Sequence, residues 1–133
     1  MKILIAEDDR VSRIFLEVLL KKLGHTVTAC EHGSLALQAY QRAADYRIVI
    51  SDWMMPHMSG LDLCRAIRGL NRPDYCYFIM ATSKARKADF LEAMSAGADD
   101  YILKPVGKDD LVARLVVAEK ALTLMRLKPR RSA

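Results

Sequence analysis

The chain has 133 residues, 52% of them hydrophobic, which is enough to build one well-packed domain. Its formal net charge is +5, but all 16 acidic residues and all but five of the 21 basic residues lie in positions 1–119, which are therefore neutral as a group. The positive excess belongs to the last fourteen positions, where it supports nucleic-acid binding only weakly and is typical of a solvated helix end or a linker.

The start of the chain and its cysteines indicate the compartment. The apolar stretch at residues 3–6 is far too short for a signal peptide or a membrane span, so we expect a cytoplasmic protein that does not insert into a membrane. Cys30, Cys64 and Cys76 form no CxxC pair and lie in apolar runs. We therefore expect reduced core residues rather than disulfides or metal ligands.

Short apolar segments alternate five times with segments of helical periodicity. The first strand is expected at residues 2–6, and the helix after it ends at Gly24, whose missing side chain suits a C-terminal cap. The predicted apolar face of this helix consists of Val11, Phe15, Val18, Leu19 and Leu23. A second strand at residues 25–30 and a second helix at about residues 34–43 follow.

The second half of the chain continues the same alternation. Three further strands are expected at residues 47–51, 77–81 and 99–103. The third helix begins at Ser59, because Ser59 and Asp62 have the spacing of a capping box. The fourth helix covers about residues 85–95 and ends at Gly97. The fifth, at about residues 108–127, has an apolar face made of Leu111, Leu115, Ala118 and Leu122.

Alternating strands and helices of this kind form parallel sheets with right-handed crossovers. Five units are too few for a closed barrel of eight, so we predict an open α/β fold. It is a flavodoxin-like, doubly wound sheet of five parallel strands in the order 2-1-3-4-5, with five helices on its two faces. Ligand sites in such sheets form just beyond the carboxyl ends of the strands.

Four of the predicted strands are followed by residues that suit phosphoryl transfer. They are Glu7, Asp8 and Asp9 after the first strand, Asp52 after the third, Thr82 after the fourth and Lys104 after the fifth. Carboxylates gathered at one edge repel one another, and a hard divalent cation relieves that repulsion. Mg²⁺ fits best, because it completes its shell with water and phosphate oxygens. Lys104 would supply a positive charge and Thr82 a hydroxyl donor to a phosphoryl group opposite the metal.

Each of these residues also has an ordinary interpretation. Asp8 or Asp9 can cap the following helix, and a lysine before proline is commonly a surface charge. Unrelated capping needs would not bring acids, a hydroxyl and an amine to one sheet edge, however, so their joint occurrence favours a functional site.

The same segments resemble a known family. The resemblance rests on Glu7-Asp8, on Asp52-Trp53-Met54-Met55-Pro56 with Ser59-Gly60 after it, on Ala81-Thr82, and on the segment from Gly97 to Pro105. These are similar to the motifs of response-regulator receiver domains of two-component signalling, and in particular of chemotaxis regulators. The resemblance covers about residues 1–122 and leaves residues 123–133 as a basic tail or linker. It implies a signalling phosphoprotein, not an enzyme, which catalyses only its own phosphorylation and slow dephosphorylation.

The resemblance also implies a role for each matching residue. Asp52 would be the phosphoacceptor, taking a phosphoryl group from a histidine kinase, a phosphotransfer protein or a small phosphodonor to give an acyl phosphate. Asp8, Asp52 and the backbone carbonyl of Met54 would bind Mg²⁺, with Glu7 acting through water. Gly60 would serve a tight backbone turn, with a helix cap as the alternative.

Other matching residues would respond to phosphorylation. Thr82 and Lys104 would each contact a phosphoryl oxygen, and the bond from Lys104 to Pro105 would be cis. Tyr101 resembles the family's switch aromatic, which turns inward as Thr82 moves toward the phosphate; an ordinary half-buried strand aromatic is the alternative. Its motion would alter the face made by the fourth helix, the last strand and the last helix. That face would bind an output domain or a protein partner, and a homodimer is possible.

The resemblance further implies that the residues two positions beyond Asp52 and Thr82, which are Met54 and Lys84, would modulate how readily water attacks the phosphate. Because Met54 cannot hold a water by hydrogen bonding, we expect moderately slow self-dephosphorylation.

Two other functions compete with this interpretation. A phosphatase that uses an aspartyl nucleophile is the first, but haloacid-dehalogenase-like enzymes usually carry a second Asp where this chain has Met54. A nucleic-acid binder that uses the basic tail is the second, and its salt-dependent DNA binding would disappear on removal of residues 126–133. In a receiver domain, nucleic acid would be bound only through a separate output domain.

Overall fold

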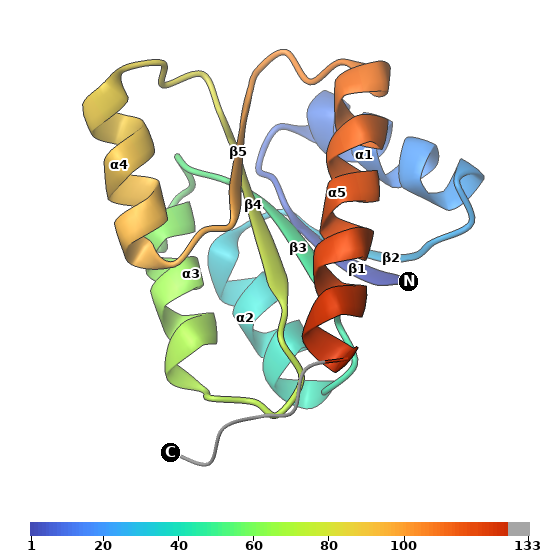
Figure 1. Ribbon diagram of the computed structural model, residues 1–133. Helices are drawn as coiled ribbons and strands as arrows, with labels where there is room; N and C mark the ends of the chain where they lie inside the picture. Colours follow the sequence, from blue (N-terminus) through green and yellow to red (C-terminus); the bar gives the residue numbers. More distant parts are fainter. Residues whose placement is uncertain (128–133) are drawn as a thin grey trace.

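Five strands and five helices alternate along the chain in the computed structural model, which describes residues 1–127 (Figure 1). The strands are β1 (Lys2–Ala6), β2 (Thr26–Cys30), β3 (Ile48–Asp52), β4 (Tyr77–Thr82) and β5 (Asp100–Leu103). The helices are α1 (Arg10–Lys22), α2 (Gly33–Arg42), α3 (Gly60–Gly69), α4 (Lys87–Ala96) and α5 (Lys108–Leu127). All neighbouring strands are parallel and their order is β2-β1-β3-β4-β5, which confirms the predicted doubly wound fold.

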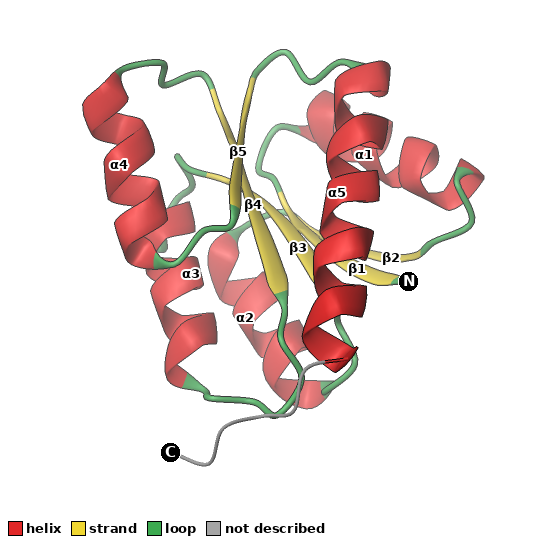
Figure 2. Ribbon diagram, in the orientation of Figure 1, coloured by secondary structure: helices red, strands yellow, loops and turns green. Residues whose placement is uncertain are grey.

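The sheet lies between two layers of helices (Figure 2). Residues of α1 and α5 pack on one face, and residues of α2, α3 and α4 pack on the other. Side chains alternate between the faces as strand geometry requires, so that Ile3 and Ile5 join the first cluster while Leu4 and Ala6 join the second. The central strands β1, β3 and β4 are almost wholly buried, whereas the edge strands β2 and β5 are partly exposed.

The predicted apolar face of α1 is confirmed at Leu19 and wrong at its other four residues, which are exposed. Val11 is 77% exposed, Phe15 43% and Val18 46%, and Leu23 is exposed as well. The residues that pack on the sheet are Leu16, Leu19 and Leu20. Apolar residues surround most of this helix, so periodicity identified the helix but did not determine which side is buried.

The predicted helix ends are confirmed. The Ser59 hydroxyl accepts from the backbone N–H of Asp62, whose side chain accepts from Ser59 in return, so that a capping box begins α3. Gly24 and Gly97 have φ angles of 94° and 110°, a left-handed conformation that glycine adopts without strain, at the ends of α1 and α4. The apolar face predicted for α5 is also confirmed, since the four residues assigned to it are all buried.

Cys64 and Cys76 are buried, Cys30 is partly buried, and all three are free, as predicted. Within residues 1–127, every helix is too short or too polar to cross a bilayer. α5 continues past residue 122 to Leu127, and the rest of the predicted basic tail, residues 128–133, lies outside the described residues.

Candidate functional site

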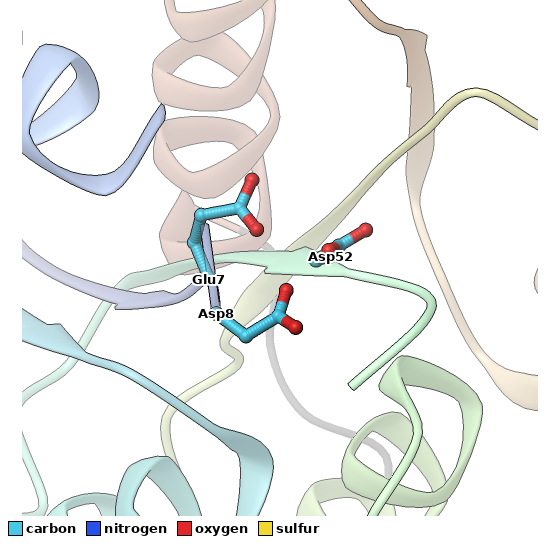
Figure 3. A group of neighbouring side chains, drawn as sticks. All are labelled: Glu7, Asp8 and Asp52. Carbon is cyan, nitrogen blue, oxygen red and sulfur yellow. The ribbon is translucent and has the colours of Figure 1, made fainter. Parts of the chain in front are cut away.

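Three carboxylates point toward one another where β1 and β3 end side by side (Figure 3). Glu7 and Asp8 directly follow β1, and Asp52 is the last residue of β3. One carboxylate oxygen from each residue lies within 4.8 Å of the others. Glu7 and Asp52 are buried, being 2% and 9% exposed, whereas Asp8 is open to solvent. The parallel sheet has therefore brought together acids that lie 45 residues apart in the chain.

Lys104 supplies a positive charge to the two buried acids. Its ammonium nitrogen lies 2.5 Å from Oε1 of Glu7 and 3.3 Å from Oδ2 of Asp52. The backbone N–H of Lys104 donates to the carbonyl of Thr82 on the neighbouring strand, which anchors the start of this loop. The peptide bond from Lys104 to Pro105 is cis, as expected.

Burial and crowding change the ionisation of this cluster. The pKa of Asp52 is raised to about 7, first by burial and then by a hydrogen bond and charge repulsion from Glu7, which together outweigh the lowering effect of Lys104. Burial alone would lower the pKa of Lys104, but its contacts with Glu7 and Asp52 outweigh that effect and raise it. The site thus holds more negative charge than its single lysine offsets.

The donor set fits a hard divalent cation. Three carboxylates offer only oxygen atoms, which Mg²⁺ prefers. One oxygen from each carboxylate lies within 4.8 Å of the other two, so the three side chains can face a single cation. The exposed side of Asp8 leaves room for the water molecules that Mg²⁺ retains.

Asp9, the third acid after β1, caps the helix that follows. Its Oδ2 accepts from the backbone N–H of Ser12 at 2.9 Å, and Asp9 is the N-cap of α1. This hydrogen bond holds the pKa of Asp9 below its usual value. The capping interpretation therefore applies to Asp9, while Asp8 joins the cluster.

Thr82, Lys84 and Tyr101 are connected through the loop after β4. The hydroxyl of Thr82, a buried residue, accepts from the backbone N–H of Lys84 at 3.2 Å. The backbone carbonyl of Lys84 in turn accepts from the Tyr101 hydroxyl at 2.6 Å. The Tyr101 ring makes edge-to-face contacts with Trp53 and Phe90. Residue 84 therefore joins the end of β4 to the aromatic residue on β5.

The side chains of the two predicted modulators lie in different surroundings. The ammonium nitrogen of Lys84 lies 4.9 Å from the centroid of the Trp53 ring, a cation–π distance. The side chain of Met54 is 62% exposed. Sequence reasoning missed the role of Trp53, which is buried directly after Asp52 and contacts both Lys84 and Tyr101.

Gly60 allows the chain after Asp52 to turn back tightly. Its N–H donates to the carbonyl of Trp53 at 2.8 Å. A Cβ atom at this position would overlap the backbone carbonyl oxygen of Asp52 and crowd Met80. Gly60 is also the first residue of α3, so the turn and the helix start coincide.

Comparisons with known proteins agree on one family. Residues 3–116 match the model of the response regulator receiver domain. Chemotaxis protein CheY1 of Helicobacter pylori is 36% identical over 118 residues, which cover 88% of this chain and 95% of the relative. Chemotaxis protein CheY of Pseudomonas aeruginosa is 37% identical, with 79% of this chain and 85% of the relative covered. The solved structure of chemotaxis protein CheY4 from Vibrio cholerae superposes with a TM-score of 0.83 at 26% identity, covering 88% of this chain and 97% of that one.

Proposed function

The chain belongs to the response regulator receiver domain family, and from this premise we propose that it is a signalling switch that accepts a phosphoryl group on Asp52 in the presence of Mg²⁺. One observation carries the proposal. Glu7, Asp8 and Asp52 converge at the carboxyl ends of β1 and β3, with Lys104 between the two buried acids. Such a set can bind a cation and a phosphoryl group together.

The chain's own residues would divide the chemistry among them. A carboxylate oxygen of Asp52 attacks the phosphorus of the donor, the bond from phosphorus to the donor atom breaks, and an acyl phosphate remains on Asp52. Lys104 would leave its acid partners to contact one phosphoryl oxygen, and the Thr82 hydroxyl would donate to another. The domain would act only on itself, as a phosphoacceptor with slow dephosphorylation.

The cation would be held by Asp8, Asp52 and the backbone carbonyl of Met54, with Glu7 bonded through water. When bound, Mg²⁺ would neutralise the carboxylates and the incoming phosphoryl oxygens. The raised pKa of Asp52 supports this assignment, because a cation offsets the repulsion that makes ionisation of Asp52 costly.

Phosphorylation would be transmitted through the loop after β4. Thr82 and Tyr101 are both hydrogen-bonded to Lys84, so movement of Thr82 toward a phosphoryl group would act on the Tyr101 contact. Tyr101 lines a hollow of about 410 Å³ on the face of α4, β5 and α5, beside the exposed side chains of Phe90 and Leu103. We propose this face as the surface for an output domain, a protein partner or a second copy of the chain, and a sensor histidine kinase or phosphotransfer protein as the donor.

Thermal unfolding with and without Mg²⁺ tests the site. A cation that binds only the folded carboxylate cluster raises the melting temperature, and beryllium fluoride added with Mg²⁺, as a mimic of the phosphoryl group, raises it further. Asp8→Asn should weaken the Mg²⁺ shift, and Asp52→Ala should abolish the response to beryllium fluoride and to acetyl phosphate. The control is Asp74→Ala, because Asp74 is an exposed acid before β4, at the opposite end of the sheet from the site. Its melting temperature should respond to Mg²⁺ and beryllium fluoride like that of the wild type. A melting temperature that does not depend on Mg²⁺ would contradict the proposal.

A turnover assay with a generic phosphomonoester separates this function from an aspartyl phosphatase. Within the lifetime of its phosphoryl group a receiver domain releases at most one phosphate per chain, whereas a phosphatase releases many in the same time. The nucleic-acid alternative depends on a tail that lies mostly outside the described residues, and DNA binding that disappears on removal of residues 126–133 would support it.

A further inference from the structure

The two acids that follow β1 are neighbours in the chain, yet both contribute to one cluster. Successive side chains of an extended strand point to opposite faces, so an uninterrupted strand would send Glu7 and Asp8 in opposite directions. β1 ends at Ala6, and an oxygen of each acid lies within 4.8 Å of Asp52. The chain leaves the extended path after Glu7 and turns at Asp8, where the backbone bends.

A side chain from α1 holds that turn. The Nη1 atom of Arg13 donates to the carbonyl oxygen of Glu7 at 2.9 Å and to that of Asp8 at 3.3 Å. Consecutive carbonyls of an extended strand also point in opposite directions, so one donor can reach both only where the chain has turned. The Arg13 side chain is partly buried, and its backbone N–H donates to the carbonyl of Asp9, which ties it to the same loop.

We propose that Arg13 is a positioning residue for the divalent-cation site, acting through the two carbonyls to direct the side chains of Glu7 and Asp8 toward Asp52. The inference rests on the proposed function, because it assigns Arg13 a role at the same Mg²⁺ site. Groups that orient metal ligands without touching the metal are known to change affinity by about 10-fold to 100-fold when removed.

The charge of Arg13 and its contacts with the two carbonyls lead to opposite predictions for Mg²⁺ affinity when the side chain is removed. The guanidinium is a cation next to a cation site, so its removal by charge alone would strengthen Mg²⁺ binding. Its removal would weaken binding if the turn depends on it. The sign of the change therefore separates a positioning role from simple proximity.

Mg²⁺ titration of the apo protein tests the inference. Trp53 is the only tryptophan of the chain and directly follows Asp52, so its fluorescence provides a signal from the site itself. The variants are Arg13→Met, Arg13→Lys and, as a matched control, Arg10→Met at an exposed position on the same helix. Far-UV circular dichroism and the melting temperature without Mg²⁺ establish that each variant is folded, and the Mg²⁺-induced melting shift provides a second readout.

We expect the Mg²⁺ dissociation constant to rise about 10-fold in Arg13→Met, and less in Arg13→Lys, which keeps the charge but not the planar donor group. Arg10→Met should remain within about twofold of the wild type or bind slightly more tightly, because only an exposed charge is lost. If only Arg13→Lys folds, weakening in that variant relative to Arg10→Met supports the inference. Unchanged or tighter Mg²⁺ binding in the folded Arg13 variants overturns it, as does equal weakening in Arg10→Met. Failure of the wild type to bind Mg²⁺ refutes the proposed function itself, and the inference with it.

Discussion

Replacing Asp52 by Asn should stabilise the domain at alkaline pH when no divalent cation is present. The substitution keeps the shape of the side chain and removes a buried negative charge that lies beside Glu7. The pKa of Asp52 is raised from 3.8 to about 7 in the folded protein, so ionising it costs more in the folded than in the unfolded chain. The stability that this group contributes is complete below pH 4 and is lost as the pH rises through about 7.

The size of the effect follows from that shift. A difference of about three units corresponds to about 4 kcal/mol, at 1.36 kcal/mol per unit. Allowing for solvent screening at the open edge of the site, we expect about half, or about 2 kcal/mol. For a chain of this length that is a rise of about 8 °C in melting temperature at pH 8, at about 4 °C per kcal/mol.

Melting curves of wild type and Asp52→Asn in EDTA at pH 8 and pH 5 measure this difference. At pH 5 the unfolded chain already ionises Asp52 while the folded protein keeps it mostly protonated, so the advantage of the variant should be about a third of that at pH 8. Saturating Mg²⁺ at pH 8 should also remove the advantage of the variant. Glu31→Gln, at an exposed acid in the loop before α2, serves as the control and should shift stability by less than about 0.5 kcal/mol. The electrostatic reasoning is refuted if Asp52→Asn is no more stable than the wild type at pH 8, or if its advantage is the same at both pH values.

Three further substitutions probe other parts of the domain. Met54→Asn should shorten the phosphoryl half-life several-fold, because an amide can hold the attacking water; an unchanged half-life in a phosphate-release assay would contradict this. Gly60→Ala should cost about 3 kcal/mol in urea unfolding and weaken Mg²⁺ binding, since its Cβ overlaps the Asp52 carbonyl, whereas Gly69→Ala, with no neighbour within 4 Å, should not. Arg68→Met should lower the urea midpoint by an equivalent of about 2 kcal/mol, because Arg68 donates to the carbonyls of Gly97 and Cys76 and pairs with Asp99. The control is Arg65→Met, because Arg65 lies on the same helix and is more exposed than Arg68. Equal losses of stability in the two variants would disprove a specific role for Arg68.

The fold was predictable because its signals are local or topological. Short apolar segments separated by helical periodicity are enough to indicate an open parallel sheet, and the strand-end rule then places Glu7, Asp8, Asp52 and Lys104 at one edge. Ser59 and Gly97 indicated helix ends for the same local reason. The buried side of α1 was not predictable in this way, because Val11 and Leu16 are equally apolar and only the tertiary packing distinguishes them.

The parts of the site that sequence reasoning missed involve backbone atoms or ring contacts. Arg13 acts on two carbonyls, and no residue type in the sequence marks a carbonyl as an acceptor. Trp53 appeared only as part of a motif, and its contact with the Lys84 ammonium depends on how two loops meet. The environment of Asp52 was likewise invisible, since its raised pKa depends on burial and on the orientation of Glu7.

The three contacts of Lys84 differ in how mutation can reach them. Only the contact with Trp53 uses the side chain. The bond to Thr82 uses the backbone N–H, which every residue except proline has, and the bond from Tyr101 uses the backbone carbonyl, which every residue has. Substitutions at position 84 can therefore remove the contact with Trp53 while both backbone hydrogen bonds remain. Among natural amino acids only proline would remove the donor to Thr82. The proposed connection from Thr82 to the face of α4, β5 and α5 would therefore survive most substitutions at position 84, which would change its strength without removing it.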